Sequence, residues 1–256
     1  HHDPSIVPNF GSSEAPKGCG TCLGPRWTTG VLMLGRRSHT QLGSRADVFV
    51  NLGCGFVTPE GWVNIDSAAG ARLAKIPGLS EVGRKLGFLK SGKWSRHIRI
   101  HDLSRRLPFA ESSVAGFYSS HTLEHMRATD GARLLSDCYR CLSPGGLIRI
   151  VVPDLAEIVA RYIGGSIEST LFLDELWATY PRYPSRLKTA LGKFFTFPHL
   201  TMYDSEGLER VLVKSGFEQV RLMPPQESLI PEIWQVEPLD RTVGAIIMEG
   251  RKPLSH

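Results

Sequence analysis

A glycine-rich turn directly follows an apolar run near residue 50. The run 48–52 (VFVNL) leads straight into Gly53-Cys54-Gly55. Such a run predicts a buried strand, and glycines at its end let a ligand approach the backbone because no side chain stands in the way. The residues expected to contact that ligand are Asn51, Gly53, Cys54 and Gly55.

Two carboxylates follow the next two predicted strands. Asp66 comes directly after the predicted strand 62–65, and Asp102 comes shortly after the predicted strand 98–100. An acid at the tip of the second strand can accept hydrogen bonds from a pair of ribose hydroxyls. The second carboxylate is suited to the exocyclic amine of adenine. With the glycine turn, these acids predict a nucleoside pocket at the carboxyl ends of neighbouring strands.

Three histidines and a further acid could move protons. His121 and His125 are four residues apart, so on a helix they would share one face, and Glu124 could orient one of the imidazoles. The surrounding sequence lacks the HExxH pattern of zinc proteases, so we expect no metal there. The candidates for a catalytic base are His121, His125, His199 and Asp154. For each histidine, a structural or ligand-adjacent role stays open.

Two CxxC pairs, Cys19/Cys22 and Cys138/Cys141, together resemble a four-thiolate zinc pattern. The second pair, however, lies with neighbouring leucines at the spacing of one helix face, which predicts that this face is apolar. Buried cysteine behaves as a small hydrophobic residue. We therefore expect core cysteines rather than a metal site or a disulfide framework.

Short apolar runs that alternate with amphipathic segments begin at residue 47 and predict an α/β sheet covered by helices. The predicted strands are 48–52, 62–65, 98–100, 114–118, 147–152, 218–222 and 244–248. The predicted helices span about 70–88, 127–142, 154–163, 168–179, 186–194 and 204–215. Asp204 or Ser205 can cap the last helix and Gly216 can end it. The Pro-Gly-Gly run 144–146 is predicted to turn the chain into the fifth strand.

The composition divides the chain into two parts. Residues 1–45 are rich in Gly, Ser, Pro and Thr and predict an irregular arm, whose start, His1-His2, looks like the remainder of a purification tag. Residues 46–252 predict one domain. Within it, the insertion 164–202 is rich in aromatic and basic residues and is typical of a lid or substrate wall. Extra helices that thicken the domain are the other interpretation.

The formal net charge of +5 permits contact with nucleic acid but does not require it. Few aromatic residues interrupt the densest basic stretch, which favours a solvated face. That stretch contains Arg84, Lys85, Lys90, Lys93, Arg96, Arg99, Arg105 and Arg106. The apolar runs are too short to span a bilayer, and no apolar core of a signal peptide precedes Gly30. We therefore expect a cytoplasmic location.

Further segments follow a known order of motifs. Besides the glycine turn and the two acids, they are 107–114 (LPFAESSV), 119–125 (SSHTLEH), 139–146 (YRCLSPGG), 151–154 (VVPD) and 215–217 (SGF). In this order and spacing, the chain resembles a class I S-adenosylmethionine (SAM)-dependent methyltransferase of the methyltransferase-11-like group. The resemblance covers about residues 46–252.

The resemblance implies a Rossmann-like α/β fold. Its seven-stranded sheet would have the order 3-2-1-4-5-7-6, with strand 7 antiparallel and helices on both faces. SAM would be the cofactor and S-adenosylhomocysteine the product. Cofactor contacts are implied for the glycine turn, Asp66, Asp102 and Leu103. By position, Ser119 and His121 would face the methionine part of the cofactor or the acceptor.

Two features depart from the usual pattern of these enzymes. Phe56-Val57 stands where a third glycine is usual, and only residues 56–61 separate the glycine turn from the second strand. A parallel crossover ordinarily takes a dozen or more residues and a helix. We therefore expect the first helix to be missing or displaced, as in a subgroup with a short "NLGCG…GWVNID" first motif.

From this resemblance we expect an enzyme that methylates an oxygen, in preference to a nitrogen, of a sugar or small metabolite. The expected partner is a small-molecule or glycan acceptor, and a homodimer stays open. One alternative is a SAM-binding partner protein without turnover. Another is a nucleic-acid methyltransferase, although no Asn-Pro-Pro-Tyr-type base-flipping motif follows the fourth strand. A nicotinamide-dependent dehydrogenase is disfavoured, because the sequence lacks both GxGxxG and a Tyr-x-x-x-Lys pair.

Overall fold

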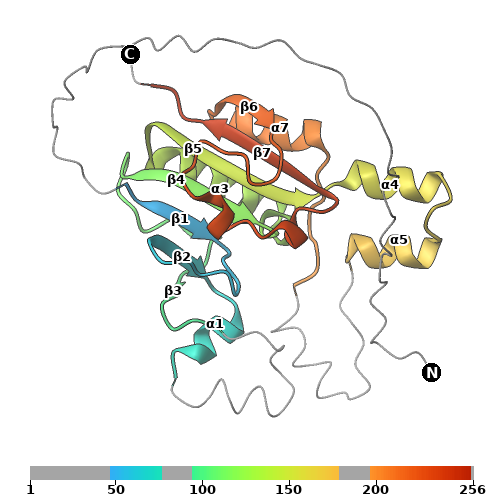
Figure 1. Cartoon of the computed structure of the whole chain (residues 1–256), viewed down its shortest axis with the longest axis horizontal. Helices are drawn as coiled ribbons and strands as arrows, with labels where there is room; N and C mark the ends of the chain where they lie inside the picture. Colours follow the sequence, from blue (N-terminus) through green and yellow to red (C-terminus); the bar gives the residue numbers. More distant parts are fainter. Residues whose placement is uncertain (1–46, 77–93, 179–196, 255–256) are drawn as a thin grey trace, which may run out of the picture. The chain divides into compact units, whose positions relative to one another are not determined.

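Seven strands form one sheet in the order β3-β2-β1-β4-β5-β7-β6 (Figure 1). The computed structural model describes residues 47–76, 94–178 and 197–254. The strands are β1 (Phe49–Leu52), β2 (Trp62–Asp66), β3 (Arg99–Ile100), β4 (Val114–Ser120), β5 (Leu142–Pro153), β6 (Glu218–Leu222) and β7 (Ala245–Arg251). The predicted arm 1–45, the predicted helix 186–194, and Cys19 and Cys22 lie outside the described residues.

Strand direction follows the predicted pattern. β1 pairs in parallel with β2 and β4, β2 with β3, and β4 with β5. β7 runs antiparallel to both β5 and β6. The predicted Rossmann-like sheet with an antiparallel seventh strand is therefore confirmed. In such a sheet, the parallel strands end at one edge, where open α/β folds bind their ligands.

Strand β5 begins earlier than predicted. Leu142 already pairs with Val114, and the register then shifts between Val114 and Gly116. The Pro-Gly-Gly run 144–146 was expected as a turn, but it lies inside the strand. Gly145, at φ +79°, donates its N–H to Lys252 O at 3.0 Å, so the irregular stretch keeps a partner beyond the end of β7.

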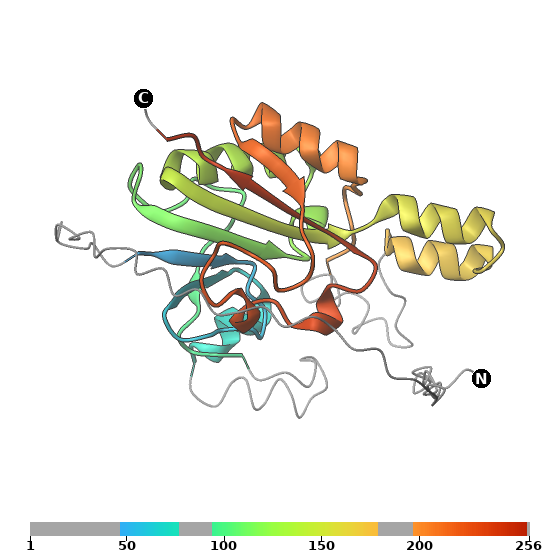
Figure 2. The same ribbon diagram turned by 45° about the horizontal axis from the view of Figure 1, so that its top comes forward.

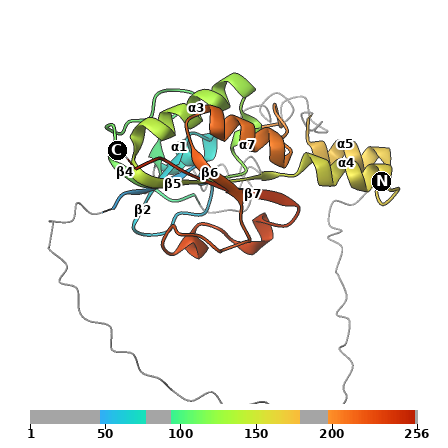
Figure 3. The same ribbon diagram turned by 90° about the horizontal axis from the view of Figure 1, so that it is seen from above.

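One face of the sheet is covered by α3 (Ala128–Cys141) and α7 (Ser205–Lys214), as Figure 3 shows. Asp204 caps α7, since its side chain accepts a hydrogen bond from Gly207 N, as predicted. Cys138 and Cys141 are both fully buried in the main hydrophobic cluster. Their place in that cluster supports the interpretation as core residues.

The opposite face is covered by residues 223–244, which we call the cover segment. It contains two short 3-10 helices, η2 (Ile233–Gln235) and η3 (Leu239–Arg241). Ile233 and Val236 pack there against Tyr118 of β4 and Ile247 of β7. Figure 3 shows the cover segment and the helices α3 and α7 on opposite sides of the strands.

Two helices follow β5 and lie side by side beyond its end (Figures 1 and 2). They are α4 (Leu155–Ile163) and α5 (Ser169–Leu176), close to the predicted bounds. Both guanidinium NH groups of Arg161 bind the carboxylate of Glu175, at 2.8 and 2.9 Å. Tyr162 stacks on Phe172 with ring centroids 4.6 Å apart. The rest of the predicted insertion is only partly described.

No helix lies between the glycine turn and β2 in the described residues 53–62. The side-chain amide of Asn51 donates to Val57 O at 2.9 Å, and that of Asn64 donates to Pro59 O at 3.0 Å. These buried amides hold the short crossover in place, and the expected loss of the first helix is confirmed. The next helix, α1 (Ala69–Ala74), starts close to the predicted residue 70 but ends at Ala74, so the predicted continuous helix 70–88 is not formed. Among the described residues, no helix has the length and apolar character that a membrane span requires.

Candidate active site

The glycine turn sits at the carboxyl end of β1 with both glycines in the left-handed region. Gly53 has φ +67° and Gly55 has φ +55°. The N–H groups of Gly53 and Cys54 both donate to Ile65 O, at 2.9 and 3.0 Å. Residues with a side chain rarely adopt these φ values. The turn is therefore fastened to the end of β2 by its own backbone.

The two glycines serve different purposes. A Cβ atom on Gly53 would lie 2.0 Å from Thr122 Oγ1, so packing inside the protein excludes a side chain there. A Cβ on Gly55 would meet nothing within 4 Å. Gly55 therefore borders open space, which is the condition for a ligand to approach its backbone.

Asp66 lies beside this turn at the end of β2. Its Oδ2 accepts from Gly55 N at 2.9 Å, and its Oδ1 accepts from Ala68 N at 2.7 Å. A carboxylate offers about four lone-pair sites, so each oxygen keeps capacity for a further donor. The predicted ribose-binding acid is thus oriented by two backbone N–H groups next to the open side of Gly55.

Asp102 follows β3 and is held in a tight local turn. Its Oδ1 accepts from Ser104 N at 2.9 Å, and Arg105 forms an ion pair with it at 3.6 Å. The hydrogen bonds from Ser104, helped by the charge of Arg105, lower the pKa of Asp102. With its side chain 45% exposed, the charged carboxylate is accessible to a donor from a ligand. Leu103 beside it is buried in the core.

Three residues predicted to contact the cofactor have buried side chains. Asn51 holds the crossover, and Ser119 is 2% exposed within β4. Burial raises the pKa of the Cys54 thiol to about 12, with a smaller contribution from the negative charge of Asp66. These side chains are packed inside the protein next to the turn and do not face open space.

Two aromatic residues beside the turn were not predicted as site residues. The rings of Phe56 and Trp94 lie 4.6 Å apart at 55°, and Phe56 is 46% exposed. Trp94 also packs against Gly70 of α1, where a Cβ would lie 2.1 Å from its Nε1. The signal in the sequence was the aromatic residue at the usual place of a glycine. In this fold Phe56, the residue after Gly55, packs its ring on Trp94 and keeps nearly half of its surface exposed.

A second site, which we call the histidine pocket, lies at the ends of β4 and β5. It has a volume of about 410 Å³. Its lining residues are His121, Glu124, His125, Pro153, Trp177, His199, Asp240 and Arg241. The three histidines predicted as base candidates are therefore brought together in one pocket.

The sequence suggested that His121 and His125 share one face of a helix, and in the structure they do not. Only Leu123–His125 is helical, as the single 3-10 turn η1, and His121 precedes it at φ +48°. The imidazole of His121 places Nδ1 3.2 Å from Glu124 Oε1 and Nε2 2.9 Å from Arg241 O. The backbone oxygen of Arg241 can only accept, so this contact is satisfied when Nε2 carries the proton and donates it.

Glu124 lies beneath the histidines and is fully buried. Its Oε1 is the partner of His121, while Oε2 has no hydrogen-bond partner in the described parts of the chain. Its backbone O accepts from Leu200 N at 2.8 Å and Thr201 N at 3.1 Å. Glu124 therefore joins the segment after β4 to the segment around His199.

The rings of His125, Trp177 and His199 pack against one another. Their centroids are 4.9 Å apart for the two histidines, and 5.7 and 5.4 Å from Trp177 to His125 and His199. His125 Nδ1 lies 3.3 Å from Pro198 O. Burial lowers the pKa of His199, although the charge of Glu124 opposes this, so the imidazole stays neutral near pH 7.

Asp154, the remaining base candidate, is not among the residues that line the pocket. Its Oδ1 accepts from Ala156 N at 2.9 Å and caps helix α4. Its backbone forms an isolated parallel bridge with Tyr203. These contacts give Asp154 a structural place at the tip of β5.

Comparison with known proteins gives one family match. Residues 81–150 match the family model described as a methyltransferase domain. No curated protein matches the sequence. The chain carries a methyltransferase domain. This match and the sheet order together make the protein an enzyme of the class that uses SAM as methyl donor.

Several solved structures are similar to this methyltransferase at low identity. A SAM-dependent methyltransferase from Methanosarcina mazei is 17% identical, with 82% of this chain and 93% of that chain covered and a TM-score of 0.46. A chain from the Haloferax volcanii complex between the Trm112 methyltransferase activator and a methyltransferase is 16% identical, with 81% and 83% covered and a TM-score of 0.43. A SAM-dependent methyltransferase from Thermotoga maritima is 17% identical, with 80% and 82% covered and a TM-score of 0.41.

A buried arginine holds one wall of the methyltransferase's histidine pocket. Arg149 of β5 is fully buried and binds both oxygens of Glu237 at 2.7 Å and Glu249 Oε1 at 3.0 Å. It also donates to Glu227 O and Pro224 O, both at 2.9 Å. These contacts fasten the cover segment, which carries Asp240 and Arg241, to the sheet. No motif in the sequence indicates this ion network.

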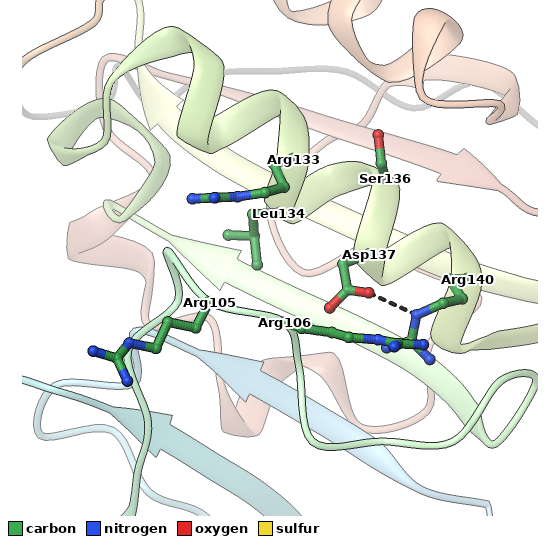
Figure 4. Close-up of a pocket in the computed structure, with 7 residues that line it drawn as sticks. All are labelled: Arg105, Arg106, Arg133, Leu134, Ser136, Asp137 and Arg140. Atoms are coloured by element: carbon green, nitrogen blue, oxygen red, sulfur yellow. Dashed lines mark hydrogen bonds and ion pairs between the residues drawn. The ribbon is translucent and has the colours of Figure 1, made fainter.

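A shallow arginine-rich pocket of about 330 Å³ lies between α3 and the loop after β3 (Figure 4). Its lining residues are Arg105, Arg106, Arg133, Leu134, Ser136, Asp137 and Arg140. Arg140 donates to Asp137 Oδ1 at 2.7 Å and to Phe109 O at 3.0 Å. The bond to Phe109 O, together with one from Arg140 to Leu107 O at 3.3 Å and one from Leu107 N to Asp137 Oδ2, fastens the loop 107–109 to α3, so part of this basic surface has a structural role in the methyltransferase.

Proposed function

We propose that the enzyme transfers the methyl group of SAM to an oxygen of a sugar or another small polar metabolite. The observation that supports this best is the convergence of three imidazoles and Glu124 in one pocket. That pocket lies at the carboxyl edge of the sheet, next to the strand end that carries the glycine turn. A hydroxyl acceptor needs a group that takes its proton, and this pocket is rich in such groups.

The residues at the end of β1 and β2 fit a bound nucleoside. Open space above Gly55, two oriented oxygens on Asp66 and the accessible charge of Asp102 match a ribose and an adenine edge. SAM, when bound, supplies a methyl group on a sulfonium, which is electrophilic without further activation. The role of these residues is to bind and orient it.

Thr122 connects the cofactor side to the acceptor side. Its Oγ1 lies 3.1 Å from Ser120 O and 3.4 Å from Leu52 O, and its side chain packs against Gly53. It directly follows His121 in the chain. Fixing the two sides rigidly favours transfer, because in-line geometry can supply roughly 7–11 kcal/mol at best.

Within the pocket, His125 and His199 are better placed than His121 to accept a proton. Both nitrogens of His121 face acceptors, so its ring serves as a donor and orients the surrounding groups. His125 directs Nδ1 at Pro198 O, which favours a proton on Nδ1 and leaves Nε2 as an acceptor. His199 Nδ1 is buried and has no partner in the described residues.

The remaining lining residues suit a polyol. Asp240 can accept hydrogen bonds from hydroxyls, and Arg241 can donate to them. Trp177 offers an apolar ring surface beside these polar groups, as sugar-binding sites require. We therefore place sugars and small polyhydroxylated metabolites first among the acceptors to be tested.

The test has two stages. Calorimetric titration with SAM and S-adenosylhomocysteine, with NAD and NADP as controls, measures the cofactor side. A panel of sugars, nucleotide sugars and phenolic metabolites is then screened for S-adenosylhomocysteine release. For a methylated acceptor, His125→Asn and His199→Asn should lower kcat by about 10²–10⁴-fold while the Kd for SAM is unchanged. Transfer to acceptors without a hydroxyl, or full activity in both variants, would contradict the proposal.

A further inference from the structure

We infer that Glu124, His125 and His199 form a binding site for a divalent transition-metal ion such as Zn²⁺. Each residue offers one ligand atom, and these atoms lie within 4.8 Å of one another. This departs from the sequence-based expectation of no metal, which rested on the missing HExxH pattern. Here the three ligands come from two separate segments, so no short motif records them.

The first argument is the free oxygen of Glu124. The side chain is fully buried, and Oε2 has no hydrogen-bond partner within the described residues. Burying an unpaired carboxylate oxygen away from water raises the free energy of the folded state, unless a cation or a hydrogen-bond donor contacts it. The contact of Oε1 with His121 Nδ1 orients the carboxylate and leaves Oε2 as the available ligand.

The second argument is the arrangement of the two imidazoles. His125 Nδ1 lies 3.3 Å from Pro198 O, which leaves Nε2 free to coordinate. Metal-binding histidines almost always direct their other nitrogen at a carbonyl or carboxylate in this way. His199 Nδ1 is buried and lacks a partner in the described part of the chain.

The third argument is that the two segments are already joined. Leu200 N and Thr201 N donate to Glu124 O, so the residue next to His199 is fixed to the residue next to His125. At zinc bond lengths, two ligand atoms of a tetrahedral ion lie about 3.3–3.5 Å apart. The present spacing of up to 4.8 Å is wider than this, so binding an ion would draw the three ligand atoms closer together.

The ligand set indicates which ions fit. Two imidazole nitrogens and one carboxylate suit Zn²⁺, Co²⁺ or Fe²⁺, whereas Mg²⁺ and Ca²⁺ prefer oxygen ligands. Three protein ligands leave a position open, as in zinc sites that bind a substrate. The charges that face the cluster are Glu124, Asp240 and the guanidinium of Arg241, with His121 beside them. The two carboxylates offset part of the positive charge that the ion adds to that of Arg241.

The role of the ion, unlike its binding, rests on the proposed function. An acceptor hydroxyl at the open position would lose its proton to water more readily, because a bound cation lowers the pKa of a coordinated oxygen. The oxygen would then bond to the methyl carbon of SAM as the carbon–sulfur bond breaks, which releases S-adenosylhomocysteine. The nitrogens of His125 and His199 would then act as ligands, and the ion would activate the acceptor in their place.

The test uses Co²⁺ as a spectroscopic probe for this site. The full chain, with His1→Ala and His2→Ala to remove the histidines at its start, is treated with chelator and titrated with CoCl₂. We expect one equivalent to bind with visible d–d absorption and without the intense near-ultraviolet thiolate band that Cys19 and Cys22 would give. Zn²⁺ should displace the Co²⁺.

Matched variants locate the site. Glu124→Gln, His125→Asn and His199→Asn should each weaken Co²⁺ binding by at least about tenfold. His97→Asn, at an exposed histidine outside the pocket, should bind as the parent does. Glu124 is fully buried, so thermal unfolding is measured for all variants. Loss of binding in His199→Asn with an unchanged Tm excludes misfolding as the cause.

The outcomes separate this inference from the proposed function. Absent Co²⁺ binding, or equal affinity in the parent and all three ligand variants, would overturn the site. Binding at the cluster without methylation of any hydroxyl acceptor would support the site and count against the proposed function. Binding at the cluster with methyl transfer unaffected by chelation would support the site and overturn its role in acceptor activation.

Discussion

The glycine turn with Asp66 and the histidine pocket, which are the proposed cofactor side and acceptor side of this enzyme, are built in different ways. The cofactor side, around Gly53, Gly55 and Asp66, is fixed by backbone hydrogen bonds between the ends of two adjacent strands. The acceptor side gathers residues from η1, the end of β5, the segment after α5 and the cover segment. The first depends on chain segments close in sequence, and the second depends on contacts across more than a hundred residues.

This contrast shows where stability and function are coupled. The turn needs little beyond its glycines and one carboxylate. The histidine pocket needs the cover segment in place, and the buried Arg149 network fastens that segment to the sheet. Changes far from the pocket should therefore damage the acceptor side while leaving the cofactor side intact.

The largest effect should come from Arg149→Met. Removing this guanidinium leaves Glu237 and Glu249 buried without their partner, which costs about 3–5 kcal/mol of unfolding free energy. Urea denaturation of the variant beside Arg133→Ala, whose ion pair with Asp130 is largely exposed, measures the difference. The control should change by at most about 0.5 kcal/mol. Equal stability of the two variants would contradict the coupling.

Asp66→Ala should have the next largest effect, confined to the cofactor side. The variant loses the proposed hydrogen bonds from the ribose to the carboxylate. It also loses the bond from Gly55 N that orders the glycine turn. Together these losses should weaken SAM binding by about 100-fold, or 2.7 kcal/mol. Calorimetry measures it, with Asp154→Ala as a control carboxylate that caps a helix. An unchanged Kd for SAM in Asp66→Ala would rule out the ribose-binding role.

Gly53→Ala and Gly55→Ala should separate packing from ligand approach. The first forces a Cβ to 2.0 Å from Thr122 Oγ1 and should lower the unfolding free energy by about 1–3 kcal/mol. The second meets no atom within 4 Å, so it should cost only about 1 kcal/mol of backbone strain and chiefly weaken SAM binding. Thermal unfolding and calorimetry are compared for both.

A double variant tests whether the contact with Thr122 is the reason for glycine at position 53. Thr122→Ala removes the clashing hydroxyl and methyl groups, so Gly53→Ala/Thr122→Ala should be more stable than the sum of the single effects indicates. Additive losses would show that the contact seen between these side chains is not the reason for Gly53.

The smallest effect concerns the buried thiols. Burial raises the pKa of Cys54 to about 12 and that of Cys141 to about 11. Both thiols should resist alkylation at pH 8 until the protein unfolds, because the thiolate is the reactive form. Their pKa is higher in the folded state, so the stability they contribute is complete below pH 9 and is lost as the pH rises above it. Iodoacetamide labelling with mass spectrometry checks the first point, and urea denaturation at pH 8 and pH 10 checks the second.

The sequence by itself determined the sheet and the meeting of the glycine turn with Asp66. The strand order is the one that the resemblance to class I methyltransferases implied, and the glycine turn and Asp66 meet because adjacent parallel strands end at one edge. It also determined the loss of the first helix, since residues 56–61 are too few to form one in a crossover. Each of these conclusions depends on local chain geometry.

Only the tertiary structure decided the rest. The sequence named His121, His125 and His199 separately, but their meeting around Glu124 depends on hydrogen bonds from Leu200 and Thr201 to Glu124 in η1, far away in the chain. It placed Asp154 among the bases, where the fold uses it as a helix cap. It gave no sign of Arg149, because a buried ion network depends on which distant carboxylates the packing brings together. Periodicity and spacing report neighbours along the chain, and these contacts are neighbours in space alone.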